Sequence, residues 1–236
     1  MKRICLFFGA AMLLLLGCSQ SKNVQYNADS DQVLGQHYTA KDFGLWYLMD
    51  FSDDRYWSLV DATLAHSPEV KQTDWDTRNG LLLSVSDTTD FMHALREGDM
   101  PLSPTGSKLI PCWWPISDSA GIVYQFNLCY GDASGKPIID GTHVKKTSVE
   151  KNDYTGRYEV LMQFDKKTAD FWQRFTAENV NSRIGIMLGT DRLLGTPRIV
   201  CEITGGACSI SEPSKEDCFA IANILNGRPL SAWRAA

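Results

Sequence analysis

The chain contains 236 residues and carries a formal net charge of −5, from 23 basic and 28 acidic side chains. An acidic balance of this size disfavours nucleic acid as a partner, because the phosphate backbone attracts basic surfaces. Hydrophobic residues make up 44% of the sequence, which at this length is enough for one substantial hydrophobic core or two small ones.

The amino terminus has the features of a bacterial export signal. Lys2 and Arg3 precede an apolar run at 4–16 that is too short for a spanning helix, so residues 1–17 are predicted to be a signal peptide. The segment Leu-Leu-Gly-Cys that ends at Cys18 is similar to the lipobox of bacterial lipoproteins. This resemblance implies a lipid on Cys18 with several acyl chains, palmitate among them, which hold a protein stably on a membrane. An ordinary signal peptide with an incidental cysteine is the alternative.

Residues 18–37 are polar and rich in Asn, Asp, Ser and Gln, so they are predicted to form a flexible tether. Removal of Lys2 and Arg3 with the signal peptide would change the formal charge from −5 to −7. Ser19 follows the cysteine where an aspartate would retain a lipoprotein at the inner membrane, so the resemblance implies passage to the outer membrane. We therefore expect a lipid-anchored protein of the bacterial cell envelope that faces the periplasm.

Residues 38–110 are predicted to form a small N-terminal α/β subdomain. The nearly continuous apolar run at 43–51 is typical of a strand buried on both faces. Strands are predicted at 43–51 and 81–85, each followed by a helix, with Asp53 capping the first helix and Asp87 with Asp90 the second. The sequence leaves open whether this part is separate or completes the sheet of the rest of the chain.

Beyond residue 110 the pattern changes to short strands. Every second residue from 122 to 128 is apolar, as expected for a strand with one buried face. A further strand is predicted at 110–116, with a turn at 132–137. Together with the predicted helices, this pattern favours an α+β fold with helices packed on one face of a sheet.

A helix with an aromatic face is the most regular element of the sequence. Asp165 is placed to cap its amino terminus, since an aspartate side chain accepts hydrogen bonds from the first free backbone N–H groups. Phe171, Trp172 and Phe175 then recur at helical spacing. The pattern predicts that these three side chains face the core and that the helix ends near Asn181.

Two strands are predicted after this helix. Every second residue at 184–188 is large and apolar, which places those side chains on one face of a strand. Pro197 precedes alternating apolar residues at 199–203, which indicates the start of a second strand. Gly205 and Gly206 then allow a backbone conformation that residues with a Cβ atom resist.

The order of these motifs resembles the first periplasmic domain, the P1 head, of the SecD and SecDF protein-export subunits. The matching residues are Phe171, Thr176 and Asn179 in the helix, the strand at 184–188, then Pro197, Gly205 and Gly206. The predicted helix at 215–226, with the Gly-Arg-Pro that follows it, resembles the closing helix of that family. The resemblance implies a head-like domain at 111–236.

The resemblance implies an α+β fold with a mixed, largely antiparallel sheet and helices packed on one face. It also implies a non-catalytic interaction module without a cofactor, linked to protein export or envelope assembly. The expected partners are envelope proteins or translocating polypeptides, besides the membrane reached through Cys18. SecD proteins couple an ion gradient to movement through membrane helices, and no segment after residue 17 is apolar for long enough to form one.

The sequence contains no clear catalytic or metal-binding motif. The four histidines are far apart, and none forms an H-E-x-x-H pair. The segment GDASG at 131–135 places its serine one position away from that of a nucleophile motif. Asp53 with Asp54, and Asp87 with Asp90, stand at predicted helix starts, where capping explains them. We therefore predict a protein that is not an enzyme and binds no metal.

The cysteines favour disulfides over a zinc site, because the compartment is oxidising and no C-x-x-C motif is present. Those after Cys18 are Cys112, Cys129, Cys201, Cys208 and Cys218. Their odd number leaves at least one thiol free, and Cys218 fits because it shares a helical face with apolar residues. The simplest pairs are then Cys112 with Cys129 and Cys201 with Cys208, although the sequence alone does not fix the connectivity. A nucleophilic thiol at Cys208 or Cys218 is the alternative.

Trp113 and Trp114 are adjacent on a predicted strand, so their side chains point to opposite faces. Packing of both rings in the core is the favoured interpretation. The alternative is a glycan-binding envelope lipoprotein, in which Trp113 or Trp114 stacks on a sugar ring and Asp118 or Asn127 donates or accepts hydrogen bonds.

Overall fold

The computed structural model describes residues 38–70, 72–76, 80–118, 121–189, 192–211 and 215–227. The predicted signal peptide, the predicted lipid site Cys18 and the tether at 18–37 lie outside these residues. The described helices are α2 (Asp54–Ala65), α3 (Val85–Glu97), α4 (Lys166–Glu178) and α5 (Lys215–Leu225), with the 3-10 helices η1 (Ala40–Asp42) and η2 (Gly141–His143). The described strands are β1 (Phe43–Leu48), β2 (Gln72–Asp76), β3 (Gly80–Ser84), β4 (Leu109–Asp118), β5 (Gly121–Tyr130), β6 (Ile139–Asp140), β7 (Val144–Lys151), β8 (Tyr158–Phe164), β9 (Ile184–Leu188), β10 (Arg192–Gly195) and β11 (Ala207–Ser211).

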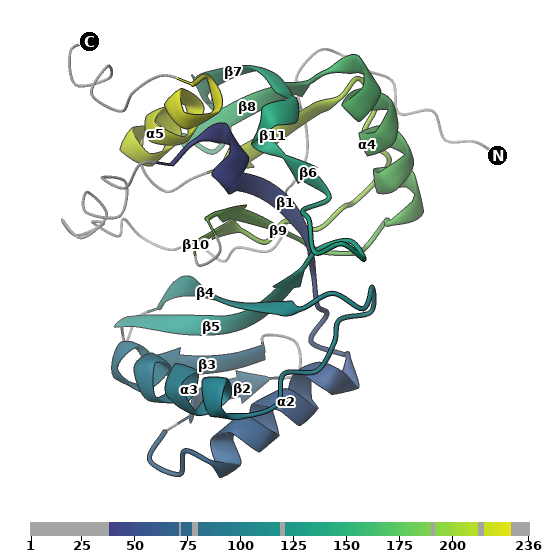
Figure 1. Cartoon of the computed structure of the whole chain (residues 1–236). Coiled ribbons are helices and arrows are strands. Elements are labelled where there is room, and N and C mark those ends of the chain that lie inside the picture. Colours follow the sequence, from purple (N-terminus) through teal and green to yellow (C-terminus); the bar gives the residue numbers. More distant parts are fainter. Residues whose placement is uncertain are drawn as a thin grey trace.

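The strands form two sheets, which lie in separate layers (Figure 1). The larger sheet has the order β2-β3-β5-β4-β10-β9-β1-β6, and the smaller one has the order β11-β8-β7. Among the described strands, neighbours run antiparallel except β10 and β4, which are parallel where Arg192 pairs with Trp113. The predicted α+β fold with a mixed, largely antiparallel sheet is therefore confirmed.

The N-terminal part of the chain contributes strands to the larger sheet. β1 pairs antiparallel with β9 from Phe43↔Leu188 to Tyr47↔Ile184, and β3 pairs antiparallel with β5. Strands from 38–110 and from 111–236 thus share one sheet, which is the arrangement that the sequence left open. The position between residues 110 and 111 lies inside β4.

Five strands of the larger sheet pair in a closed ring. The pairings run from β5 through β4, β10, β9 and β1 and return to β5, where Leu48 lies opposite Cys129. Each strand of the ring contributes one residue to a small buried cluster, which consists of Leu48, Cys112, Cys129, Met187 and Leu193. The interior is tight, because a Cβ atom added to Gly185 would lie 2.5 Å from the Sγ of Cys129. Close packing of this kind leaves no room for an extra methyl group.

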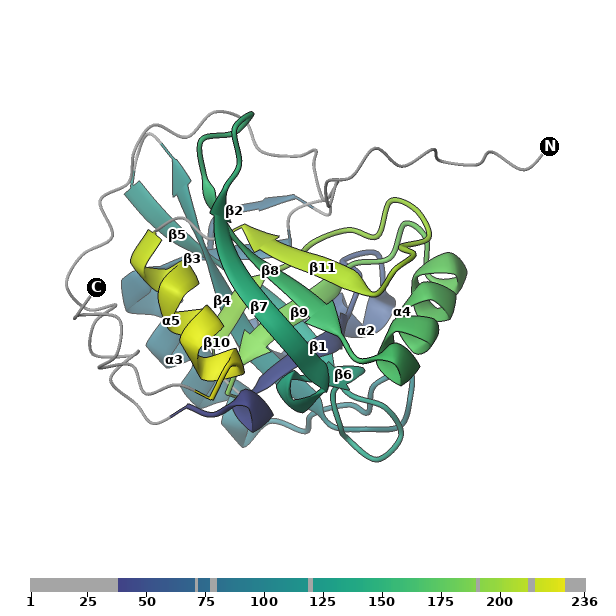
Figure 2. The same cartoon turned by 90° about the horizontal axis from the view of Figure 1, so that it is seen from above.

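Two larger cores lie outside this ring, and each is covered by helices. One core fills the space between β1, β9 and the smaller sheet, with α4 and α5 at opposite sides of that sheet (Figure 2). The other core lies under α2 and α3, which pack together against β3 and β5. Tyr56 of α2 connects these elements: its hydroxyl donates to the Phe126 carbonyl at 2.9 Å and accepts from the Leu81 N–H at 3.0 Å.

Helix α4 begins as the sequence predicts. The Asp165 side chain accepts a hydrogen bond from the Thr168 N–H. Trp172 and Phe175 are buried, but Phe171 is 37% exposed, so the predicted burial of all three aromatic side chains is wrong for Phe171. Asn179 follows the last helical residue and donates from Nδ2 to the Phe175 carbonyl.

The strand predicted after Pro197 is absent from the described residues, where this stretch forms an isolated bridge between Arg183 and Arg198. The backbone is satisfied in other ways. The Ile199 N–H donates to the Ser182 carbonyl, and the Ile203 N–H donates to the Thr176 hydroxyl. The regular strand β11 begins only after Gly206.

Helix α3 begins earlier than predicted. Its N-cap is Ser84, whose side chain accepts from the Asp87 N–H, while Asp87 and Asp90 lie inside the helix. The serine takes the capping position because β3 ends directly at it, and a hydroxyl caps as well as a carboxylate.

Candidate functional site

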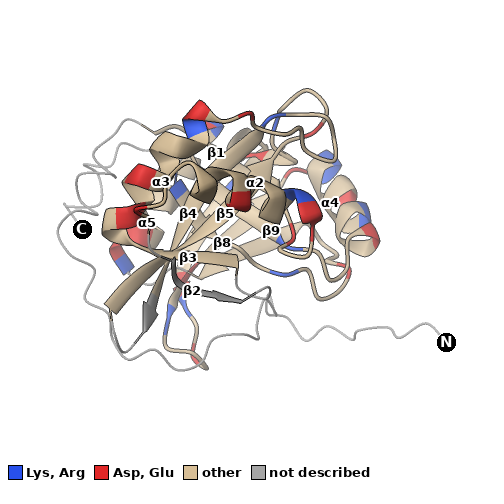
Figure 3. Cartoon of the chain, turned by 90° about the horizontal axis from the view of Figure 1, so that it is seen from below, with Lys and Arg blue, Asp and Glu red and all other residues tan. Residues whose placement is uncertain are grey.

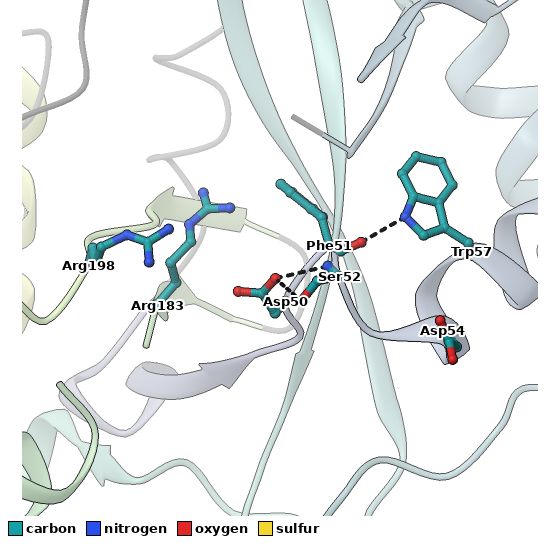
Figure 4. A pocket seen from close by; sticks show the side chains of 7 residues that line it. All are labelled: Asp50, Phe51, Ser52, Asp54, Trp57, Arg183 and Arg198. Atoms are coloured by element: carbon teal, nitrogen blue, oxygen red, sulfur yellow. Dashed lines mark hydrogen bonds between the residues drawn. The ribbon is translucent and has the colours of Figure 1, made fainter. Parts of the chain in front are cut away.

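A pocket of about 580 Å³ lies where the turn after β1 meets the segments that flank β9 and β10 (Figure 4). Its wall on one side is the turn between β1 and α2, and on the other side two arginines. The lining residues are Asp50, Phe51, Ser52, Asp54, Trp57, Arg183 and Arg198.

The turn at the pocket is held by its own polar side chains. Asp50 accepts at Oδ1 from the Ser52 N–H at 2.9 Å and from the Ser52 hydroxyl at 2.8 Å. Asp53 caps α2 by accepting from the Arg55 N–H, as predicted. The Ser52 backbone and hydroxyl hydrogen bonds hold the pKa of Asp50 below its usual range, and Arg198 and Arg183 lower it further. Asp50 is therefore an anion at neutral pH.

Trp57 forms the other end of the pocket wall. Its indole N–H donates to the Phe51 carbonyl at 2.7 Å (Figure 4). Its ring also meets the Tyr56 ring edge-on, with centroids 5.0 Å apart. These contacts fix the orientation of the indole, so it presents a preformed apolar surface.

Arg183 is the partly buried charge of the pocket. Its Nε and Nη2 donate to the carbonyl and hydroxyl oxygens of Thr196, and its guanidinium lies over the Phe51 ring at 5.1 Å from the centroid. Burial lowers the pKa of Arg183 below its usual range, and the positive charge of Arg198 lowers it further. No described carboxylate lies within ion-pair distance of this guanidinium.

Arg198 is exposed and lies beside Arg183 (Figure 4). The two residues face each other directly in the isolated antiparallel bridge, so their side chains leave the backbone on the same side. Arg198 donates from Nη1 to the Asn181 carbonyl at 2.6 Å. Asn181 adopts a positive φ of 73°, the left-handed conformation that asparagine tolerates better than most residues.

Elsewhere, charges of both signs are interspersed. Seen from below, red acidic and blue basic patches are scattered over the helices on this side (Figure 3). Among the described residues, no group of three or more His, Cys, Asp or Glu side chains is placed to hold a metal ion. The pocket also carries both signs, with the adjacent arginines on one side and Asp50 and Asp54 on the other.

The predicted disulfide partners are free thiols in the structure. Cys112 and Cys129 lie in the ring interior with their Sγ atoms 3.5 Å apart. Cys201 is exposed, whereas Cys208 is buried. Burial raises the pKa of Cys208 to about 12, which makes it a poor nucleophile. Cys218 is buried on α5 as expected, and both pairings stay predictions.

The two adjacent tryptophans belong to core packing. Trp113 packs on the rings of Phe91 and Phe126, with centroids 5.8 and 5.1 Å away. Trp114 packs against the cluster inside the ring. Asn127 is fully buried, and the side chain of Asp118 is outside the described part. The glycan-binding alternative therefore receives no support.

The motif residues of the predicted head-like domain make structural contacts in α4 and in the segments that follow it. The Thr176 hydroxyl donates to the Trp172 carbonyl and accepts from the Ile203 N–H. The Pro197 carbonyl accepts from the Ile184 N–H. Gly205 and Gly206 both have positive φ values, of 80° and 68°. These residues have structural contacts, and none of them lines the pocket.

Sequence reasoning missed the pocket. Asp50, Trp57, Arg183 and Arg198 come from three separate segments, and no local motif connects them. The sequence carries no signal for the pocket, because the two arginines become neighbours only through the isolated bridge.

The family model for the SecDF P1 head subdomain matches residues 131–232. This match confirms the resemblance that the motifs predicted, with a start at 131 where the sequence predicted 111. It includes Arg183 and Arg198 but not the turn at 50–57, so the pocket joins the matched part of the chain to the preceding part.

Two solved structures show a weaker similarity over most of the chain. One is described as "Structure and function of a membrane component SecDF that enhances protein export", with 19% identity, a TM-score of 0.43, and coverage of 92% of this chain and 72% of that chain. The other is SecDF in a "Super-membrane-facing form", with 17% identity, a TM-score of 0.42, and coverage of 86% and 21%. The sequence has no significant match among curated proteins. No described helix has the length and apolar character needed to span a membrane.

Proposed function

We propose that this protein is a lipid-anchored, non-catalytic periplasmic module of protein export, which contacts translocating polypeptides or the export machinery. The observation that carries the proposal is the match of residues 131–232 to the SecDF P1 head subdomain. That segment contains the smaller sheet with α4 and α5, together with β9 and β10 of the larger sheet.

The anchor in this proposal is the lipid on Cys18. The tether at 18–37 has a composition that behaves as a flexible chain, whose end-to-end distance for such a length is about 25 Å. The folded part would therefore stay close to a membrane surface while it turns freely. Replacement of Cys18 by alanine should release the protein from the membrane fraction, and a protein that remains there would contradict the anchor.

The smaller sheet offers a site for an extended polypeptide. β11 is an edge strand of that sheet, paired on one side with β8. An edge strand can accept another strand through main-chain hydrogen bonds, which tolerate many sequences. This property suits a module that contacts unrelated polypeptides during export.

The test is mild crosslinking in intact cells, followed by purification and mass spectrometry. The wild-type protein should recover export components or newly exported envelope proteins, and the Cys18→Ala variant should lose them. Recovery of only the same abundant outer-membrane proteins by the wild type and by Cys18→Ala would contradict the proposal.

A further inference from the structure

We propose that the pocket between Trp57 and the two arginines binds a carboxylate that is carried next to an apolar group. The C-terminal residue of a polypeptide and an acidic side chain in an extended segment both provide this chemistry. The site itself is inferred from its geometry alone, and the inference rests on the proposed function only for the source of the ligand.

The pocket places two like charges directly opposite each other. Arg183 and Arg198 stand opposite each other in an antiparallel bridge, and like charges in that position destabilise the pairing. Burial of Arg183 adds to this cost. Among the described residues neither arginine has an ion-pair partner, and like charges left in this state are typical of functional sites. An anion placed between the two guanidinium groups would remove the repulsion.

Both arginines have guanidinium N–H groups that are available to a ligand. Arg183 uses Nε and Nη2 to hold Thr196, and Arg198 uses Nη1 to hold Asn181. Among the described residues, Nη1 of Arg183 and Nη2 of Arg198 have no hydrogen-bond partner. Both side chains are therefore fixed at one edge and have donors available at the other. A carboxylate matches such planar donors with paired, charge-assisted hydrogen bonds.

The pocket already contains an acidic side chain beside the arginines, that of Asp50. The positive charges of both arginines lower the pKa of Asp50. Its Oδ1 nevertheless accepts hydrogen bonds from Ser52. Among the described residues, neither arginine is within ion-pair distance of it. With Asp54, it balances the formal charge of the lining. Asp50 is thus an internal competitor that keeps binding weak and reversible.

Phe51 and Trp57 form an apolar wall of the pocket. The Trp57 indole is fixed by its hydrogen bond to the Phe51 carbonyl, and Arg183 covers the Phe51 ring. An apolar group carried beside the carboxylate would face this tryptophan. The pocket volume of about 580 Å³ lies in the range of small-ligand sites, so it admits a short part of a peptide rather than a folded partner.

The experiment uses 3-phenylpropionate, which has one carboxylate and one phenyl ring, with 3-phenylpropionamide as the uncharged control. Binding to the purified protein is followed by NMR, through the Trp57 indole N–H and Arg183 Nε–H signals. The acid should bind at least about tenfold more tightly than the amide, because charge-assisted bonds to arginine are lost in the amide.

Three variants test the electrostatics. Arg198→Gln should weaken binding about fivefold to tenfold, and Asp50→Asn should strengthen it severalfold, because it removes the competing anion. Arg174→Gln on α4 is the matched control, since Arg174 is exposed and donates a hydrogen bond to the Asp170 carbonyl of its own helix, and it should bind as wild type does. Arg198→Gln should not lower the melting temperature, which separates loss of binding from loss of folding.

Equal binding of acid and amide, or no loss in Arg198→Gln, would overturn the proposal. Weaker binding of the acid in Asp50→Asn would overturn the role of Asp50 as a competing anion. Peptides with a free or an amidated C-terminus, and with or without an internal glutamate, then identify the source of the carboxylate. If these ligands bind but crosslinking recovers no export partner, the pocket stands and the proposed function fails. Export partners without probe binding give the opposite result.

Discussion

Gly206 lies directly against Ala169 of α4, because a Cβ atom added to Gly206 would stand 2.3 Å from the Cβ of Ala169. The preceding residue, Gly205, has open space around the same position. The double glycine therefore has two different roles. Both residues provide a positive φ, but only Gly206 allows the helix and the turn to approach closely.

Alanine at each glycine separates these roles. Gly205→Ala introduces backbone strain alone and should cost about 1 kcal/mol of unfolding free energy. Gly206→Ala adds the collision with Ala169 and should cost about 3 kcal/mol or more. Denaturant unfolding measures both values. Equal losses would mean that the contact with α4 relaxes at no cost.

The interior of the strand ring gives a second prediction. Gly185→Ala should lower the unfolding free energy by about 1–3 kcal/mol, because its Cβ would lie 2.5 Å from the Sγ of Cys129. Adding Cys129→Ala removes that sulfur and should return part of the loss, so the double-mutant cycle should show a favourable coupling. Strictly additive effects would contradict this packing argument.

Thiol chemistry tests the cysteine arrangement. In the reduced, folded protein, iodoacetamide at neutral pH should label the exposed Cys201, whereas Cys208 should stay unlabelled because burial raises its pKa to about 12. Unfolding in denaturant should make Cys208 reactive, which serves as the control.

The pair at Cys112 and Cys129 has a separate outcome. Protein purified from the periplasm should contain a disulfide between them, because their Sγ atoms are already 3.5 Å apart and exported proteins meet a disulfide oxidant. Peptide mapping without reduction measures the linkage. Recovery of both residues as free thiols would contradict the prediction.

The loss of stability at acid pH should depend on Asp50. Its pKa is lowered in the folded protein by the Ser52 hydrogen bonds and the two arginines. Its stabilising contribution is therefore present above the ordinary pKa of an aspartate, near 4, and is lost as the pH falls through the lower folded value. Asp50→Asn should flatten this acid limb, as measured by melting temperature between about pH 2 and pH 6. An unchanged profile would show that Asp50 contributes nothing.

The elements that depend on neighbours in sequence were predictable. Asp165 caps α4, and the alternation at 184–188 forms β9. These signals are local, since capping and side-chain periodicity act within a few residues. The strand predicted at 199–203 failed for the opposite reason. Its apolar alternation is real, but the Thr176 hydroxyl takes the Ile203 N–H, and that contact comes from a distant helix.

The pocket was not predictable in the same way. Its arginines become neighbours only through an isolated bridge, and Trp57 joins them from a different segment. A pair of like charges has no meaning in sequence until the backbone brings the residues together. The structure therefore adds most where the sequence has no periodic pattern.

The position of β1 determines when the larger sheet can be completed. This strand is among the first described elements, yet its partner β9 lies near the other end of the chain. Contacts between such distant segments slow folding, because a long loop must close before they form. As the chain emerges from its amino terminus, β1 can pair with β5 and β6 once residue 140 has followed, but its pairing with β9 must wait until residue 188 has emerged. An exposed apolar strand in that interval is a target for chaperones, and the rate of emergence should set how long it needs one.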